Sequence, residues 1–193
     1  MKTIILMRHS IAKRLDIPNN ELPLSEDGKK LALKVKEDIK VYNINKCYCS
    51  SSLRAYETAS ILFEKIEVIH DLHERIIGEA KEDFWYKQYT NYDYKNVGGE
   101  SLNEVKVRMQ KTISGILNHS EENDCILIVS HGTAICSYLL NFCTIEVIDE
   151  LNRSRRIAYK NKEIMTGNIE PTNYFILKFI DNKIEEIEFV KSI

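Results

Sequence analysis

The sequence predicts an α/β fold, a three-layer sandwich in which helices cover both faces of a mainly parallel central sheet. Two short apolar runs of strand length, residues 3–7 and 125–129, alternate with longer segments in which apolar residues recur every three or four positions. Strands connected through helices pair in parallel, and a parallel sheet needs a layer of helices on each face.

The first half of the chain supplies three expected strands and two helices. After the strand at residues 3–7, Ser25 caps a helix in which Leu31, Val35 and Ile39 share one side. A strand at residues 46–50, a helix at 53–63 and a strand at 66–69 are expected next. Residues 81–94 are aromatic and polar, and we expect a short helix and loop lying over the domain.

The second half begins with the clearest helix, over residues 101–117, where Ser101 and Glu104 form a capping box. A buried strand at 125–129 and a helix at 133–142 follow. Residues 174–180 and 184–190 are expected to form a hairpin that turns at 181–183. We predict a single domain, residues 1–193, with about 71–100 as an insert or lid over the site.

Composition excludes several classes of protein. The formal net charge is −2 with 29% charged residues, which gives no electrostatic basis for binding nucleic acid or a membrane surface. No apolar run approaches the ~20 residues of a membrane span, and the first apolar run is too short for a signal peptide. The five cysteines are odd in number and lack C-x-x-C spacing, so a reduced, cytoplasmic setting is expected.

Polar residues follow three of the expected strands. Arg8 and His9 follow the first, Arg54 comes shortly after the second, and His131 follows the strand at 125–129. The carboxyl ends of parallel strands meet at one edge of a sheet, and the helices after the second and fourth strands add N–H groups there. We therefore expect an anion site with an imidazole within reach.

This set of side chains suits phosphoryl transfer. Arginine makes two hydrogen bonds to a phosphate edge, and a neutral histidine is able to attack phosphorus. A second histidine, if protonated, stabilises the phosphoryl oxygens. The leaving oxygen needs a proton from a carboxylic acid, for which the candidates are Glu74, Glu79 and Glu100.

Six segments of the chain resemble the motifs of the histidine phosphatase superfamily, which includes the phosphoglycerate mutases. They occur in the family's order: MRHS at 7–10, PLSEDG at 23–28, SSSLRAYETA at 50–59, LHERIIG at 72–78, GGESL at 98–102 and VSHG at 129–132. The resemblance covers nearly the whole chain and implies a phosphoglycerate mutase-like form of the three-layer fold.

The resemblance also implies a role for each matching residue. His9 would be the phosphate-accepting nucleophile, and Arg8, Arg54 and His131 would form the phosphate pocket around it. Glu74 would be the proton donor and later the base for water. No metal or organic cofactor is implied. The implied substrate is a small phosphorylated metabolite or a phosphorylated protein.

The chain departs from the mutase pattern at two points. Ser10 replaces a glycine, and residues 11–15 lack an asparagine that the mutases carry. We therefore expect a phosphatase that hydrolyses a phosphomonoester, or another phosphoryl group, through a phosphohistidine on His9. Mutase-type phosphoryl transfer and an inactive module that only binds a phosphorylated ligand are the alternatives.

Three further groups carry weaker signals. The basic stretch from Arg153 to Lys162 is interpreted as a solvated loop, with a rim that attracts an anionic substrate as the alternative. The aromatic residues of 84–94 either pack in a lid or stack on an aromatic substrate, and both readings stay open. The other histidines, His70, His73 and His119, lack ligand-like spacing and are expected to be ordinary surface or loop residues.

Overall fold

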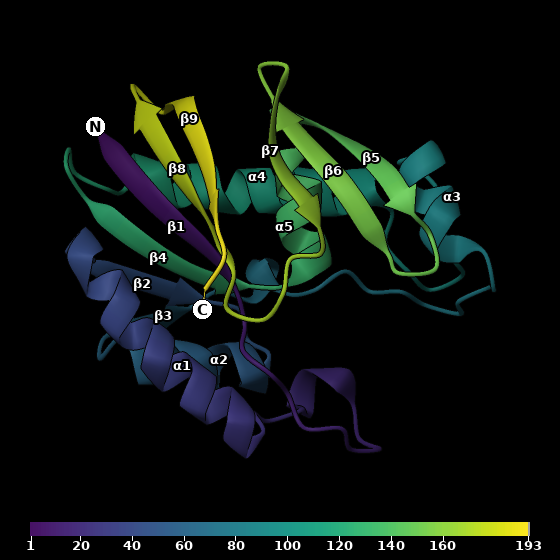
Figure 1. Ribbon diagram of the computed structural model, residues 1–193, viewed down its shortest axis with the longest axis horizontal. Helices are drawn as coiled ribbons and strands as arrows, with labels where there is room; N and C mark the ends of the chain where they lie inside the picture. The colour runs from purple at the N-terminus through teal and green to yellow at the C-terminus, as the bar shows by residue number, and fades with distance from the viewer. Residues whose placement is uncertain (193) are drawn as a thin grey trace.

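The structure is a computed structural model that describes residues 1–192, and its centre is a six-stranded sheet (Figure 1). The strands of this sheet are β1 (Lys2–Arg8), β2 (Lys46–Cys49), β3 (Ile66–Val68), β4 (Cys125–Ser130), β8 (Tyr174–Ile180) and β9 (Lys183–Val190). Their order is β3-β2-β4-β1-β8-β9. The first four strands in this order are parallel, whereas β8 and β9 are antiparallel to their neighbours. The predicted mainly parallel sheet is confirmed.

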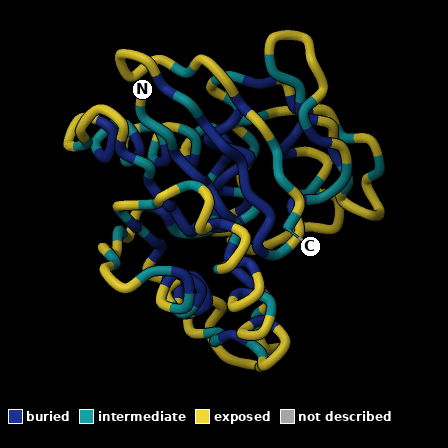
Figure 2. Tube along the Cα trace, turned by 60° about the vertical axis from the view of Figure 1, so that its left-hand side comes forward, coloured by how far each residue is buried: buried dark blue, intermediate teal, exposed yellow. Residues whose placement is uncertain are grey.

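Helices cover both faces of the sheet, as predicted. The longer helices are α1 (Glu26–Ile39), α2 (Leu53–Leu62), α4 (Leu102–Asn118) and α5 (Gly132–Leu139). Successive side chains of a strand point to opposite faces, and β1 is apolar on both. Ile5 and Met7 pack in the core on the α1 and α2 side, while Ile4 and Leu6 belong to the core formed with α4 and α5. The strand is therefore buried on both faces (Figure 2).

Shorter helices and helix caps complete the main domain. The short helices are η1 (Asn19–Glu21), η2 (Lys40–Tyr42), η3 (His70–Leu72) and α3 (Phe84–Thr90). The hydroxyl of Ser25 accepts a hydrogen bond from the amide of Gly28 over 3.0 Å and begins α1. Ser101 and Glu104 form both hydrogen bonds of the predicted capping box at the start of α4. Among residues 1–192, no helix is both long and apolar enough to cross a bilayer.

A second sheet of three antiparallel strands lies beside α5 (Figure 1). Its strands are β5 (Cys143–Asp149), β6 (Ser154–Tyr159) and β7 (Lys162–Gly167). Ile145, Ile157 and Met165 join the core on the α4 and α5 side. The sequence analysis did not predict this sheet, and the interpretation of residues 153–162 as a solvated loop is wrong. Arg155 within β6 is only 9% exposed, so the basic stretch is partly interior.

The strand register brings the expected polar residues together. Arg8 at the end of β1 lies opposite Ser130 at the end of β4, and Cys49 at the end of β2 lies opposite Val129. The residues that follow each strand therefore leave the sheet side by side. His9 is fixed there, because its backbone amide donates to the carbonyl of Ser130 over 2.9 Å.

Candidate active site

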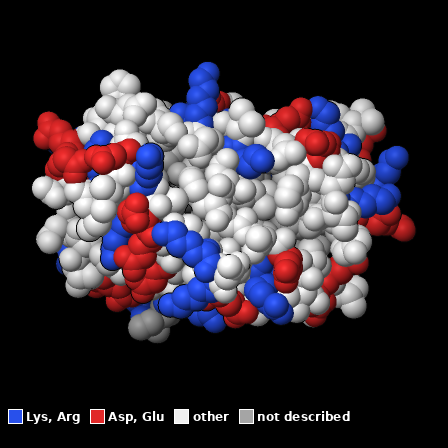
Figure 3. All heavy atoms as spheres, turned by 90° about the horizontal axis from the view of Figure 1, so that it is seen from above, with Lys and Arg blue, Asp and Glu red and all other residues white. Residues whose placement is uncertain are grey.

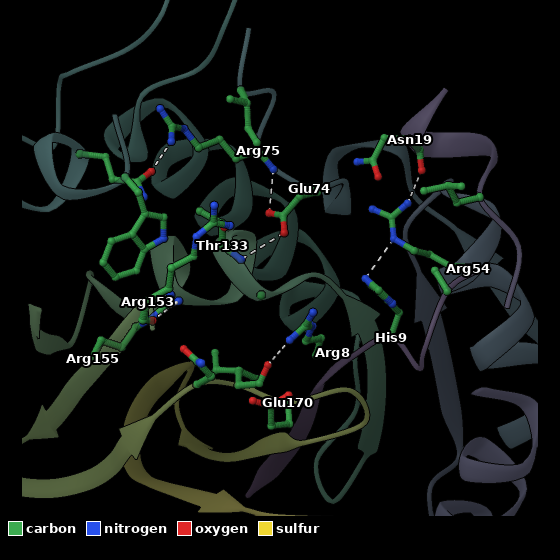
Figure 4. A pocket seen from close by; sticks show the side chains of 18 of the residues that line it. Arg8, His9, Asn19, Arg54, Glu74, Arg75, Thr133, Arg153, Arg155 and Glu170 are labelled. Atoms are coloured by element: carbon green, nitrogen blue, oxygen red, sulfur yellow. Dashed lines mark hydrogen bonds between the residues drawn. The ribbon is translucent and has the colours of Figure 1, made fainter. Parts of the chain in front are cut away.

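A cavity of about 510 Å³ lies at this edge of the sheet. Its lining includes four of the residues singled out from the sequence: Arg8, His9, Arg54 and Glu74. Figure 4 shows Arg54 and His9 on one side of the cavity, with Arg8 and Glu74 nearer its middle. The volume lies within the range of small-molecule sites and exceeds what a phosphoryl group alone requires.

The imidazole of His9 has a defined tautomer. Its Nδ1 lies 2.6 Å from the carbonyl oxygen of Ser10, which accepts hydrogen bonds only, so Nδ1 carries the proton. Its Nε2 accepts a hydrogen bond from Nε of Arg54 over 3.0 Å and is therefore the unprotonated nitrogen, with its electron pair directed at Arg54. Burial, together with the charges of Arg54 and Arg8, lowers the pKa of His9 to about 3. His9 is thus a neutral base whose Nε2 faces the cavity.

Two guanidinium groups lie beside this nitrogen. Arg54, on the first turn of α2, donates to the carbonyl of Asn19, to Nε2 of His9 and to Nδ1 of His131. Arg8 donates to the carbonyl of Ile169 through Nη1, while its Nε has no hydrogen-bond partner within residues 1–192. Burial lowers the pKa of both groups, yet arginine stays charged. Both charges therefore need an anion to stabilise them.

His131 lies behind Arg54 and is fully buried. Its Nδ1 accepts from Nη2 of Arg54 over 3.1 Å, so its Nε2 carries the proton and donates to the hydroxyl of Ser50 over 2.8 Å. Burial and the nearby His9 and Arg54 lower the pKa of His131 well below its ordinary value. His131 is therefore neutral here, unlike the protonated form considered above, and it contacts the cavity through Arg54.

Of the three candidate acids, only Glu74 lines the cavity. Its carboxylate accepts hydrogen bonds from the backbone amides of Arg75, Thr133 and Ala134, at 2.8, 3.2 and 3.0 Å. Two of these amides belong to the first turn of α5. The N-terminus of α5 therefore binds Glu74, which corrects the expectation that its amides are free for the ligand.

The other two acids have different surroundings. Glu79 is exposed on a loop outside the cavity. Glu100 forms an ion pair with Arg108 over 3.0 Å and accepts a hydrogen bond from the amide of Ile76. The structure thus separates the three candidates that the sequence left together.

The sequence model of the histidine phosphatase superfamily (branch 1) matches residues 4–181. This match spans both histidines at the strand ends and all the residues of the candidate active site described above. The chain belongs to the histidine phosphatase superfamily. It is accordingly an enzyme of the histidine phosphatase type, and the resemblance seen in its sequence motifs is confirmed.

Solved structures of several other proteins share the fold of this histidine phosphatase. Mycobacterial glucosyl-3-phosphoglycerate phosphatase is 18% identical with a TM-score of 0.72, covering 98% of this chain and 96% of its own. Bacillus stearothermophilus YhfR is 20% identical, with a TM-score of 0.73 and coverage of 96% and 95%. A phosphoserine phosphatase variant from Entamoeba histolytica, in complex with phosphoserine, is 18% identical, with a TM-score of 0.68 and coverage of 97% and 97%. No curated protein sequence matches this chain.

The cavity of this histidine phosphatase has further walls. The sequence offered the aromatic residues of 84–94 and the stretch from Arg153 to Lys162 as alternatives for contacting the substrate, and it gave no signal for the rest. These walls come from η1, from α3 with the loop before it, and from the second sheet: Asn19, Arg75, Phe84, Trp85, Gln88, Asn152, Arg153, Arg155, Asn168 and Glu170. Phe84 and Trp85 thus reach the cavity, whereas the ring of Tyr89 is buried beside Arg155. Within residues 1–192, no three His, Cys, Asp or Glu side chains gather in the way a metal site requires.

Proposed function

We propose that this protein is a phosphatase that hydrolyses a phosphomonoester through a phosphohistidine intermediate on His9. The observation that carries the proposal is the state of His9. Its Nδ1–H donates to the carbonyl of Ser10, so the electron pair of Nε2 lies beside Arg54 at the cavity wall. A neutral, oriented imidazole next to two guanidinium groups is what attack on a phosphoryl group needs.

The reaction proceeds in two steps. In the first, Nε2 of His9 forms a bond to phosphorus as the ester P–O bond breaks, and the departing oxygen takes a proton from Glu74. In the second, water attacks phosphorus and gives its proton to Glu74, while the P–Nε2 bond breaks and its electron pair returns to His9. The products are the alcohol and inorganic phosphate.

Each remaining residue has a part in this scheme. Arg8 and Arg54 bind the phosphoryl oxygens and stabilise the charge on them as phosphorus is attacked. His131 does not line the cavity itself and acts on the phosphate pocket through Arg54, which it positions by a 3.1 Å hydrogen bond. The three backbone amides that bind Glu74 hold its carboxyl group in one orientation over the cavity.

The substrate we propose is a small phosphorylated metabolite. Two proteins of the same fold are described as phosphatases for glucosyl-3-phosphoglycerate and for phosphoserine. A walled cavity of about 510 Å³ also suits a small molecule better than a protein surface. Cytoplasmic action is proposed as well, since all five cysteines are free thiols.

Acid-quenched phosphoryl transfer from a radiolabelled phosphomonoester tests the proposal. Wild type is expected to carry an acid-labile, base-stable label and to release phosphate, whereas His9→Ala loses both and keeps the fold by circular dichroism. His70→Ala, which alters an exposed histidine outside the cavity, serves as the matched control and keeps the label. Full activity in folded His9→Ala would overturn the proposal. Conversion of 3-phosphoglycerate to 2-phosphoglycerate without free phosphate would indicate a mutase instead.

A further inference from the structure

Three arginines line the cavity away from His9, namely Arg75, Arg153 and Arg155. In Figure 4, Arg153 and Arg155 lie on the side opposite His9 and Arg54, with Glu74 and Arg8 between them. The phosphoryl chemistry proposed above uses none of these three. They come from the loop after η3 and from the second sheet, which are separate parts of the fold.

Arg75 is buried without a carboxylate partner. Its side chain is 4% exposed, its Nε donates to the carbonyl of Glu100 over 2.6 Å, and its Nη1 donates to the side chain of Gln88. Its Nη2 has no hydrogen-bond partner within residues 1–192, and no ion pair to Arg75 occurs there. Burial lowers the pKa of Arg75, which shows that its charge is poorly stabilised.

Arg155 is also buried and also lacks a carboxylate partner. Its Nη1 donates to the hydroxyl of Tyr89 and to Sγ of Cys136, and its guanidinium lies 5.5 Å from the ring of Trp85. Burial raises the pKa of both Tyr89 and Cys136, so both are neutral near pH 7, and no carboxylate lies within ion-pair distance of Arg155 in residues 1–192. Its Nε also has no hydrogen-bond partner in the described part of the chain.

Arg153 is exposed and lies in the turn between β5 and β6. Its backbone has a φ of 55°, a left-handed conformation that is uncommon for residues other than glycine and asparagine. Its guanidinium makes neither a hydrogen bond nor an ion pair within residues 1–192. The side chain is therefore available for a ligand at the rim of the cavity (Figure 4).

Of the three arginines outside the cavity, two have carboxylate partners and the third, Arg14, is exposed to solvent. Arg108 is paired with Glu100 at 3.0 Å, and Arg156, the neighbour of Arg155, lies 3.6 Å from Glu146 and 3.4 Å from Glu163. On the face shown in Figure 3, Lys and Arg are likewise interspersed with Asp and Glu. Buried arginine is thus a property of the cavity: the arginines that are at least nine-tenths buried within residues 1–192, Arg54, Arg75 and Arg155, all line it, and none has a carboxylate in ion-pair contact.

The charge in the cavity exceeds what one phosphoryl group neutralises. Five arginines line it against two carboxylates, Glu74 and Glu170, and its histidine is neutral. In Figure 4, Glu170 lies on the Arg8 side. A phosphomonoester dianion leaves the guanidinium groups at the far end without a counter-charge. Burial of unpaired charge is unfavourable, so a second anion stabilises this arrangement.

We propose that the substrate carries a second anionic group, a carboxylate or a phosphate, that binds among Arg75, Arg153 and Arg155 while its phosphoryl group lies beside His9. The phosphoryl end of this arrangement rests on the function proposed above. Phe84 and Trp85 line the same cavity and give the carbon skeleton an apolar surface. The site therefore selects for acidic phosphomonoesters.

Two matched pairs of compounds test this selection. 3-Phosphoglycerate and glycerol 3-phosphate differ only by a carboxylate in place of a hydroxymethyl group. 1,3-Propanediol bisphosphate and its monophosphate differ by a second phosphate. In at least one pair, wild type is expected to favour the more acidic member about tenfold or more in kcat/KM. The pair that shows the preference identifies the second group.

Charge-removing variants connect the preference to the arginines. Arg153→Asn, which tolerates the left-handed backbone, and Arg75→Gln are each expected to reduce the kcat/KM ratio by about fivefold or more. Arg155→Gln is expected to do the same if it folds. Arg156→Gln is the control, because Arg156 is exposed and lies outside the cavity, and it keeps the ratio of wild type.

Binding to folded His9→Ala separates this inference from the proposed function. Calorimetric Kd values for the same four compounds need no turnover. If His9→Ala prefers the more acidic compounds in Kd but wild type hydrolyses none of the four, the second anion site is retained and the proposed phosphatase reaction is overturned. Hydrolysis of both members of each pair at equal kcat/KM, or a preference that Arg153→Asn and Arg75→Gln leave intact, overturns the second site. Neither binding nor hydrolysis of any of the four compounds overturns both.

Discussion

Nε of Arg54 donates to Nε2 of His9 over 3.0 Å, so the guanidinium covers the very atom that we propose as the nucleophile. This contact has two consequences. A phosphoryl oxygen has to take over the Arg54 hydrogen bond before Nε2 reaches phosphorus. The positive charge also disfavours protonation of His9, which adds to the effect of burial on its pKa.

The pH dependence of phosphoenzyme formation follows from this contact. The pKa of His9 is lowered to about 3, so the imidazole stays neutral in moderate acid. At subsaturating substrate, where the rate reports the free enzyme, the single-turnover rate is expected to change less than about twofold between pH 7 and 5 on account of His9, whereas a histidine of ordinary pKa would lose about 25-fold. Rapid-quench measurements of phosphoenzyme formation distinguish these two pH dependences. Arg54→Gln removes a positive charge, so its acid limb is expected at higher pH than that of wild type.

The role of Glu74 is tested by the choice of leaving group. If Glu74 protonates the departing oxygen, Glu74→Gln lowers kcat for an alkyl phosphate by about 10²–10⁴. The p-nitrophenolate group of p-nitrophenyl phosphate leaves without needing a proton, so the rate of phosphoryl transfer from this substrate to His9 is expected to fall far less. Glu79→Gln, an exposed acid outside the cavity, is the matched control. Equal losses for both substrates in the rate of phosphoryl transfer to His9, a step that precedes the attack of water, would show that Glu74 does not protonate the departing oxygen.

Sequence reasoning found the part of the site that depends on the parallel sheet. Arg8 ends β1, and His9 and His131 directly follow β1 and β4. Both strands are apolar on both faces, and such strands are easy to recognise. The position of Arg54 follows from the helix after β2. Glu74 was separated from Glu79 and Glu100 only by the amides of α5, a contact between segments distant in sequence.

The far wall of the cavity was not predictable in the same way. Cys143 and Ile145 alternate with exposed Thr144 and Glu146, which is a signal for β5 that the sequence analysis missed. In β6, however, a buried position is occupied by Arg155, whose charge hides the strand pattern. Interior arginines break the rule that charged residues lie outside, and only the assembled cavity accounts for them.

Gly28 is expected to be intolerant of a side chain. A Cβ at this position would clash with the carbonyl oxygen of Ile11, which itself accepts a hydrogen bond from the amide of Ser25. Gly28→Ala therefore has to displace the start of α1, and we expect a loss of about 1–3 kcal/mol in the free energy of unfolding. Gly115→Ala in α4 is the control. No atom lies near its Cβ, and a gain of roughly 0.4–1 kcal/mol is expected. Urea unfolding measures both, and similar stability of the two variants would contradict the prediction.

The buried histidines also make the fold sensitive to acid. His9 titrates near pH 3 when folded but near 6.5 when unfolded, so between these values the unfolded chain binds more protons. The contribution of neutral His9 to the free energy of unfolding is fully present above pH 6.5 and is lost as the pH falls towards 3. Between pH 6.5 and 5, His9 alone is expected to contribute a loss of roughly 2 kcal/mol.

Comparison with His9→Ala isolates this contribution from that of other groups. Carboxylates such as Glu104, whose pKa is lowered by Lys95, also lose stabilising interactions in acid, but they do so equally in both proteins. The free energy of unfolding from urea titrations is therefore expected to fall less steeply with pH in His9→Ala than in wild type. Parallel pH profiles for the two proteins would show that His9 titrates normally in the folded state, which would remove the basis for a neutral nucleophile in acid.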